Sequence, residues 1–137
     1  MVYSILEHPA DLGIEARGKT LREAFEEAAV ALTSVIVDLD AVGVMIDRIL
    51  TVEARDVESL LVRWLSELLY LYDGEGFLCK EAHIQQFSPT RMEAKVRGEW
   101  YAAGKHRTKL DVKAITYHQL EIKEDLSGGC IRVYLDI

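Results

Sequence analysis

The run HPADLG, residues 8–13, holds the first residues of the chain that could do chemistry. His8 and Asp11 flank a predicted bend between two short strands, where a carboxylate and exposed carbonyl oxygens would come together. Such oxygens are the ligands that hard cations such as Ca²⁺ and Mg²⁺ take at flexible geometry. Asp and Gly are also ordinary turn residues, so on spacing alone a plain turn is the stronger interpretation.

The end of the sequence offers a second group of oxygens. Asp136 is followed by Ile137, so a side-chain carboxylate stands one residue from a terminal carboxylate. Chain ends often fray, and this pair alone predicts nothing. Together with Asp11, however, these anionic groups would repel one another without a cation and would become ligands of Ca²⁺ or Mg²⁺ with one.

A third stretch, Lys113–His118, reads KAITYH and combines a lysine, a threonine, a tyrosine and a histidine. Thr, Tyr and His suit a half-buried strand, which is the plain interpretation. The functional alternative is a polar cluster on the face of a sheet, with Lys113 as its charged member. The sequence contains no Ser-His-Asp order, P-loop or G-x-G-x-x-G run, so no catalytic motif is predicted.

Other elements must position these residues, and the clearest of them is a helix over residues 56–76. Its apolar residues recur at the i, i+3, i+4, i+7 spacing of an amphipathic helix. They are Val57, Leu60, Leu61, Trp64, Leu65, Leu68, Leu69 and Tyr72. Asp56 can cap its start, and Gly74 and Gly76 favour its end. A helix this apolar has to pack on another element, which the remaining sequence indicates is a β-sheet.

A second helix is predicted to begin at Thr20 and to end near Val37, because Thr20 and Glu23 have the spacing of a capping box. Alternating patterns and turn residues predict strands over most of the remaining chain. Their ranges are 2–8, 13–18, 44–55, 77–87, 91–101, 109–125 and 130–137, with irregularities expected at Ile49–Leu50 and Ala114–Thr116.

The last four strands follow one another without a helix between them, which indicates antiparallel pairing. We therefore expect an α+β fold: a mainly antiparallel β-sheet with the two amphipathic helices packed on it, in a single domain over residues 1–137. The order permits the final strand to pair beside the first. That pairing would bring Asp136 close to the predicted bend at residues 8–13.

Length, composition and charge restrict the class of protein further. The 137 residues are 50% hydrophobic and 28% charged, as in folded globular domains. A formal net charge of −7 argues against strong direct binding to nucleic acid, which depends on many Lys and Arg contacts to phosphate. With no signal peptide or membrane-length apolar run in view, a cytoplasmic location is expected. Cys79 and Cys130 are expected as reduced, buried thiols.

Five motifs occur in an order that resembles a known family. They are HPADLG near the start, TLREAFEEAAVAL in the first helix, WLSELLYL in the second, VKAITYH, and the terminal VYLDI. In this order and spacing they are similar to the archease family over essentially the whole chain. Each motif is modest alone, and the five in register make the resemblance specific.

The resemblance implies a function that the residues alone do not. Archeases are small acidic α+β proteins that act as cofactors of the RtcB-type tRNA-splicing ligase. That ligase joins RNA ends carrying a 2′,3′-cyclic phosphate or 3′-phosphate to a 5′-hydroxyl, using GTP, a divalent metal and a guanylylated histidine. An archease promotes guanylylation and multiple turnover and broadens nucleotide use, and it is not an enzyme itself. The expected partner of this chain is therefore such a ligase.

The resemblance also implies a divalent-cation site, typically for Ca²⁺, formed by the Asp of the H-x-A-D-x-G motif and the last two residues. In this sequence these are Asp11, Asp136 and Ile137. Three further residues are candidates for acting on the partner: His8, Lys113 and His118. The chain has Pro9 where the family usually has Thr, which removes a hydroxyl and stiffens the bend but leaves the expected ligands unchanged.

Two other classes of function stay open. A chaperone-like, protein-binding module would use the cation only to hold the C-terminal strand in place, and it would suppress aggregation of unrelated proteins. A small metal-dependent enzyme is the weaker alternative, because no acid/base pair stands in a defined pocket motif.

Overall fold

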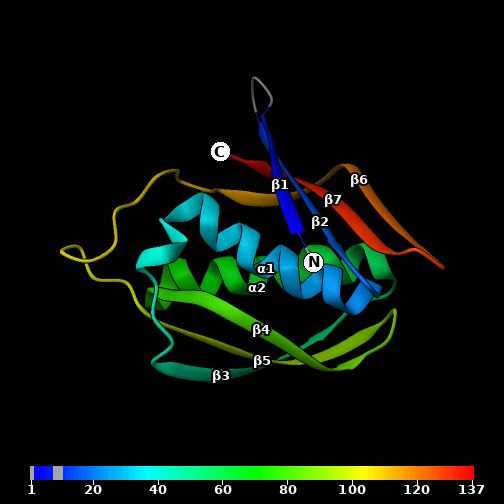
Figure 1. The fold of residues 1–137 in the computed structure, drawn as a ribbon, viewed down its shortest axis with the longest axis horizontal. Helices are drawn as coiled ribbons and strands as arrows, with labels where there is room; N and C mark the ends of the chain where they lie inside the picture. Colours follow the sequence, from blue (N-terminus) through cyan, green and yellow to red (C-terminus); the bar gives the residue numbers. More distant parts are fainter. Residues whose placement is uncertain (1, 8–10) are drawn as a thin grey trace.

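The fold is seen in a computed structural model that describes residues 2–7 and 11–137 (Figure 1). Within them the strands are β1 (Val2–Glu7), β2 (Asp11–Gly18), β3 (Ile46–Glu53), β4 (Phe77–Phe87), β5 (Arg91–Trp100), β6 (Ala114–Asp125) and β7 (Gly128–Asp136). The helices are α1 (Leu21–Ile36), the short 3₁₀ helix η1 (Leu39–Ala41) and α2 (Val57–Glu75). None of the helices in these described ranges is long and apolar enough to cross a membrane.

Two antiparallel sheets enclose the helices, as Figure 1 shows. The first sheet has the strand order β1-β2-β7-β6, and the second has the order β3-β5-β4. Helix α1 packs against β2, β7 and β4, while α2 packs against β6, β4 and β3, so both helices contact both sheets. The α+β class and the antiparallel pairing are confirmed. The sequence predicted one sheet, whereas the structure has two. The two helices bury apolar side chains toward both sheets, so one sheet alone could not cover them.

The ends of both helices follow the predicted capping. Thr20 Oγ1 accepts the Glu23 N–H at 3.2 Å, and Asp56 Oδ1 accepts the Ser59 N–H at 2.8 Å. Gly76 ends α2 with φ 77°, a left-handed conformation that glycine adopts without steric cost. These caps provide hydrogen-bond partners for backbone groups that have none within the helix. Because the capping residues are local, the sequence predicted the helix bounds closely.

Two strand predictions need correction. Strand β2 begins at Asp11 instead of residue 13, so Asp11 lies within a strand and not in a bend or turn. No irregularity occurs at Ile49–Leu50, because the register of β3 with β5 runs unbroken from Ile46 to Glu53. Ile49 simply points outward and is 58% exposed, which explains the two adjacent apolar residues.

The strand predicted over residues 109–125 begins only at Ala114. Lys109 is used elsewhere: its backbone N–H donates to the Ile36 carbonyl at 2.7 Å, and its Nζ donates to the Ser34 carbonyl at 2.8 Å. These carbonyls belong to the last turn of α1, which contains no basic residue of its own. The chain is therefore held at the helix end before it enters the sheet.

The irregularity in β6 also lies further along than predicted. The register with β7 shifts between Thr116 and Glu121, instead of at residues 114–116. Gln119 within this stretch has φ 52°, a conformation that non-glycine residues seldom adopt. The bulge lifts the neighbouring side chains out of the regular ladder, and Tyr117 is 57% exposed.

The basic segment after β5 is anchored by a buried hydrogen bond between Glu99 and His106. Glu99 and His106 are both buried, and Glu99 Oε2 lies 2.7 Å from His106 Nε2. The same carboxylate accepts the Gly43 N–H at 2.8 Å and lies 2.8 Å from Lys105 Nζ. His106 Nδ1 accepts the Ala102 N–H, so Nε2 carries the hydrogen that faces Glu99.

Candidate cation site at one end of the first sheet

Strands β2 and β7 bring the two aspartates of the sequence analysis together. In their antiparallel register Asp11 stands directly opposite Asp136. Residues in such a pair point to the same face, with Cβ atoms about 4.5–5.5 Å apart. Their neighbours Leu12 and Leu135 are buried in the core, so both aspartates lie on the outer, solvent-facing side of the sheet. The last strand therefore pairs with β2, and not with the first strand as the sequence analysis allowed.

The start of β6 completes this end of the sheet. Ala114 is the register partner of Asp136, and the Lys113 N–H donates to the Asp136 carbonyl at 2.7 Å. Lys113 thus lies beside Asp136 through its backbone. Ile137 is partly buried and packs against the hydrophobic core, which fixes the backbone that follows Asp136. Three strands converge where the sequence placed its candidate ligands.

Tyr134 lies next to the aspartates on the same face of the sheet. It is the register partner of Gly13, and its ring lies across that residue. A Cβ added to Gly13 would come within 2.9 Å of Tyr134 Cε1, closer than real Cβ contacts, and within 3.0 Å of Leu6 Cβ, which is tighter than most. The glycine of the HPADLG run is therefore required for close packing, so that the ring can lie against the strand.

His118 reaches this end of the sheet through Tyr134. Thr116 Oγ1 donates to the Tyr134 carbonyl at 2.9 Å and accepts the His118 N–H at 3.3 Å. The rings of His118 and Tyr134 meet edge to face, with centroids 6.3 Å apart. His118 thus contacts Tyr134, which stands two residues before Asp136 on β7. Lys113 and His118 are both near the candidate site, whereas His8 lies outside the described residues.

The chemistry of this arrangement suits a hard cation. Two carboxylates on adjacent positions of one face repel each other, and a divalent cation between them removes that cost. One Asp11 oxygen, Oδ1, is buried, so part of this carboxylate is shielded from water. Among the described residues no three His, Cys, Asp or Glu side chains gather as a metal centre. Further ligands would be main-chain oxygens, such as those of Ile137, or water, both of which Ca²⁺ accepts.

Sequence reasoning included Thr116 in the candidate stretch Lys113–His118 but missed Tyr134 as part of this end of the sheet. Tyr134 looked like an ordinary strand residue, and its proximity to the aspartates depends on the pairing of β7 with β2 and β6. A signal was present in the alternation of the last strand, where Tyr134 and Asp136 share a face. The isolated glycine of β2 was a second signal, since glycine inside a strand often marks a close approach.

The fold and the site together define a class of small α+β proteins in which two antiparallel sheets enclose two helices and the second and last strands meet through paired aspartates. Residues 3–137 match the model of the Archease protein family (MTH1598/TM1083). The chain is 36% identical over 139 residues to "Protein archease" of Methanosarcina mazei, covering 98% of this chain and 95% of that protein. The chain belongs to the archease family.

Solved structures agree with this assignment. The solution structure of protein 1598 of Methanobacterium thermoautotrophicum has a TM-score of 0.82 and 33% identity, over 98% of each chain. The crystal structure described as an archease, possible chaperone, from Thermotoga maritima has a TM-score of 0.64. At 20% identity, over 100% of this chain and 98% of that one, it supports the fold alone.

Proposed function

We propose that this protein is a non-catalytic activator of an RtcB-type tRNA-splicing RNA ligase and promotes guanylylation of that ligase and its multiple turnover. In this proposal a divalent cation, Ca²⁺ in preference to Mg²⁺, binds to Asp11, Asp136 and main-chain oxygens of Ile137. Likeness to the archease family supports the class of partner. The observation that carries the proposal is the direct pairing of Asp11 with Asp136 on the outer face of the sheet.

Charge supports association with such a partner. A ligase that handles RNA and GTP needs a basic active site, and a protein of formal net charge −7 would be steered toward it. The cation would then place positive charge at the contact, where nucleotide phosphates are bound. Lys113, whose backbone N–H donates to the Asp136 carbonyl, and His118, whose ring contacts Tyr134, are the candidates to contribute side chains. His8 stays a candidate for the same role.

The test is a guanylylation time course with the purified cognate ligase and labelled GTP, with and without this protein. We expect the wild-type chain to accelerate covalent guanylylation and to convert single-turnover ligation of excess RNA into multiple turnover. Asp11→Asn and Asp136→Asn remove one charge each and nearly preserve shape. Each should lower the acceleration about tenfold, the effect of losing about 1.4 kcal/mol of cation binding.

Asp73→Asn is the matched control, because Asp73 is an exposed aspartate at the far end of α2. It should activate as the wild type does. Equal activation by folded Asp11→Asn and Asp136→Asn chains would remove the cation site from the mechanism. A wild-type chain that leaves the ligase unchanged but suppresses aggregation of unrelated proteins would establish the chaperone-like alternative, with the cation only tying down β7.

A further inference from the structure

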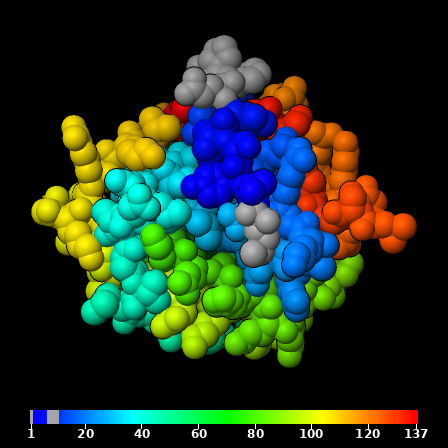
Figure 2. Space-filling view, in the orientation of Figure 1, coloured from blue at the N-terminus to red at the C-terminus, as the bar shows by residue number. Residues whose placement is uncertain are grey.

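Helix α2 exposes one of its faces between the edges of the two sheets. Strand β1 and helix α1 occupy the face of the molecule seen in Figure 2, and α2 lies behind α1 in Figure 1. On its own side α2 contacts β6 and β3, which are the edge strands of the first and the second sheet. Arg63 and Tyr70, two turns apart on α2, are exposed there.

A cavity of about 320 Å³ opens on this face near the start of α2. Three segments line it: Ala54 and Arg55 precede the helix, Ser59 and Arg63 belong to its first turns, and Tyr117 belongs to β6. Ser59 and Arg63 are four residues apart, so they lie on the same side of the helix. The volume is at the lower end of the range for small-molecule sites, roughly 300–1,000 Å³.

The described lining of this cavity has two positive charges and no negative one. Arg63 makes no ion pair with any other described residue. Arg55 Nε lies 3.7 Å from Asp56 Oδ2, a long contact between accessible side chains that contributes little. Asp56 is engaged by the helix cap, where hydrogen bonds from the backbone and the side chain of Ser59 lower its pKa. Both guanidinium groups are therefore available to an anion, and the helix dipole adds positive potential at this end of α2.

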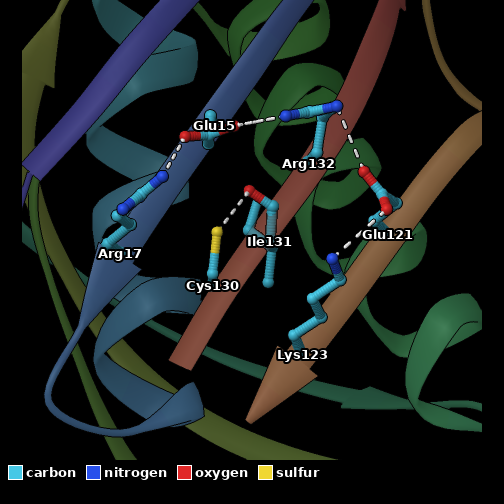
Figure 3. A network of polar contacts seen from close by, with 7 residues as sticks. All are labelled: Glu15, Arg17, Glu121, Lys123, Cys130, Ile131 and Arg132. Carbon is cyan, nitrogen blue, oxygen red and sulfur yellow. Dashed lines mark hydrogen bonds and ion pairs between the residues drawn. The ribbon is translucent and has the colours of Figure 1, made fainter. Parts of the chain in front are cut away.

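Arginines on the outer face of the first sheet show the contrast, as Figure 3 shows. Arg132 Nη2 lies 2.8 Å from Glu15 Oε2, and its Nη1 lies 3.1 Å from Glu121 Oε2. Arg17 Nη2 lies 2.8 Å from Glu15 Oε1. Carboxylates of the chain itself neutralise these arginines. The two arginines of the α2 cavity have no such carboxylates in its lining, so an anionic ligand is the partner that fits them.

Tyr117 adds a planar aromatic surface to the same cavity. The register of β6 with β7 shifts between Thr116 and Glu121, and Tyr117 is 57% exposed within this bulge. An accessible aromatic ring beside arginine side chains is a surface on which nucleobases stack. Guanidinium groups, in turn, bind phosphate oxygens through pairs of parallel hydrogen bonds. The lining thus combines one partner for a base with two partners for a phosphate.

We propose that this cavity binds a mononucleotide, whose phosphate is held by Arg55 and Arg63 and whose base stacks on Tyr117. Stacking does not distinguish strongly among bases, so the site selects a phosphate joined to a planar base and not one particular base. The cavity faces α2, whereas the paired aspartates lie on the outer side of the first sheet. The inference therefore stands without the proposed function, since it rests on a different set of residues.

The experiment is an NMR titration of the isotope-labelled full chain, with a chelator present so that no divalent cation recruits phosphate. The probes are adenosine monophosphate, which has both parts, ribose 5-phosphate, which lacks the base, and adenosine, which lacks the phosphate. We expect adenosine monophosphate to shift the amide signals of Arg55, Ser59, Arg63 and Tyr117. It should bind at one site per chain, about tenfold more tightly than either of the other probes.

Two variants separate the two parts of the ligand. Arg63→Gln should lower the affinity for adenosine monophosphate about tenfold and leave the affinity for adenosine unchanged, because only the phosphate loses a partner. Tyr117→Leu should lower the affinity for adenosine monophosphate by a similar factor and leave the affinity for ribose 5-phosphate unchanged. Added salt should weaken the binding of both phosphates but not that of adenosine.

Arg22→Gln is the matched control, because Arg22 is an exposed arginine at the start of the other helix and does not line the cavity. It should bind each probe as the wild type does. The proposal is overturned if adenosine monophosphate does not bind the wild type, or if the shifted signals lie away from the cavity. Undiminished binding of adenosine monophosphate by folded Arg63→Gln or Tyr117→Leu chains would overturn it as well.

Discussion

Gly13 shows how one residue connects the motif near the start of the chain to the last strand. Its register partner Tyr134 lies over the position where a side chain would stand, and Leu6 closes the other side. Tyr134 is only 7% exposed although it belongs to the outer face of the sheet. Beside the paired aspartates, this packing places a buried aromatic ring next to the candidate cation site.

Gly13→Ala should therefore destabilise the protein by about 1–3 kcal/mol, the usual cost of overpacking a tight contact. Urea denaturation followed by circular dichroism measures the change in the free energy of unfolding. Gly104→Ala is the control, because a Cβ added at Gly104 meets no atom within 4 Å. An equal and small effect of both substitutions would show that the Tyr134 ring moves aside without cost.

At the scale of elements, the segment between β5 and β6 is more than a connection. Lys109 caps the end of α1, and the buried pair of Glu99 and His106 holds the preceding turn against the loop at Gly43. Hydrogen bonds from Lys105, Gly43 and His106 lower the pKa of Glu99 to about 2. The segment is thus fastened at two points before the chain reaches the candidate cation site at Lys113.

This pKa predicts how stability changes with pH. A carboxyl whose pKa falls from 4.5 to about 2 on folding stabilises the protein fully above pH 4.5. That contribution is lost as the pH falls through the interval between these values. Glu99→Gln should therefore lower the free energy of unfolding by about 1–3 kcal/mol at neutral pH, the range for losing hydrogen bonds to a buried charge.

The difference between wild type and Glu99→Gln should shrink steadily as denaturation curves are recorded at lower pH. Comparing the two chains at each pH cancels the titration of all other carboxyls. Asp73→Asn, an exposed substitution, should show no such narrowing. A gap between wild type and Glu99→Gln that stays constant down to the lowest pH would contradict the ionised, buried state of Glu99.

Elements were predictable from the sequence wherever their signals are local. The helices were located to within one or two residues, because Thr20, Asp56 and Gly76 are caps that act on their own helix. The strand predicted from residue 109 failed for the opposite reason. Its first residues alternate as a strand does, but Lys109 is held by carbonyls of α1, more than seventy residues earlier.

At the scale of the whole molecule, the division into two sheets was not predictable, because it depends on which distant strands pair. The same limit applies to the site: Asp11 and Asp136 were recognised as candidates, but their meeting depends on the pairing of β2 with β7. The resemblance to archeases predicted that these two aspartates belong to one site, and the register of β2 with β7 places them opposite each other. The cavity lined by Arg55, Arg63 and Tyr117 went unrecognised, because its side chains come from segments that are far apart in the sequence.

The central claim, that Asp11 and Asp136 bind one divalent cation, is tested most directly by calorimetric titration of the metal-free protein with Ca²⁺. The account predicts that the wild type and Asp73→Asn each bind one Ca²⁺ ion per chain. In Asp11→Asn and in Asp136→Asn the affinity for Ca²⁺ should fall about tenfold or more. Calcium binding that is undiminished in both of these variants, or no binding to the wild type, would contradict the account.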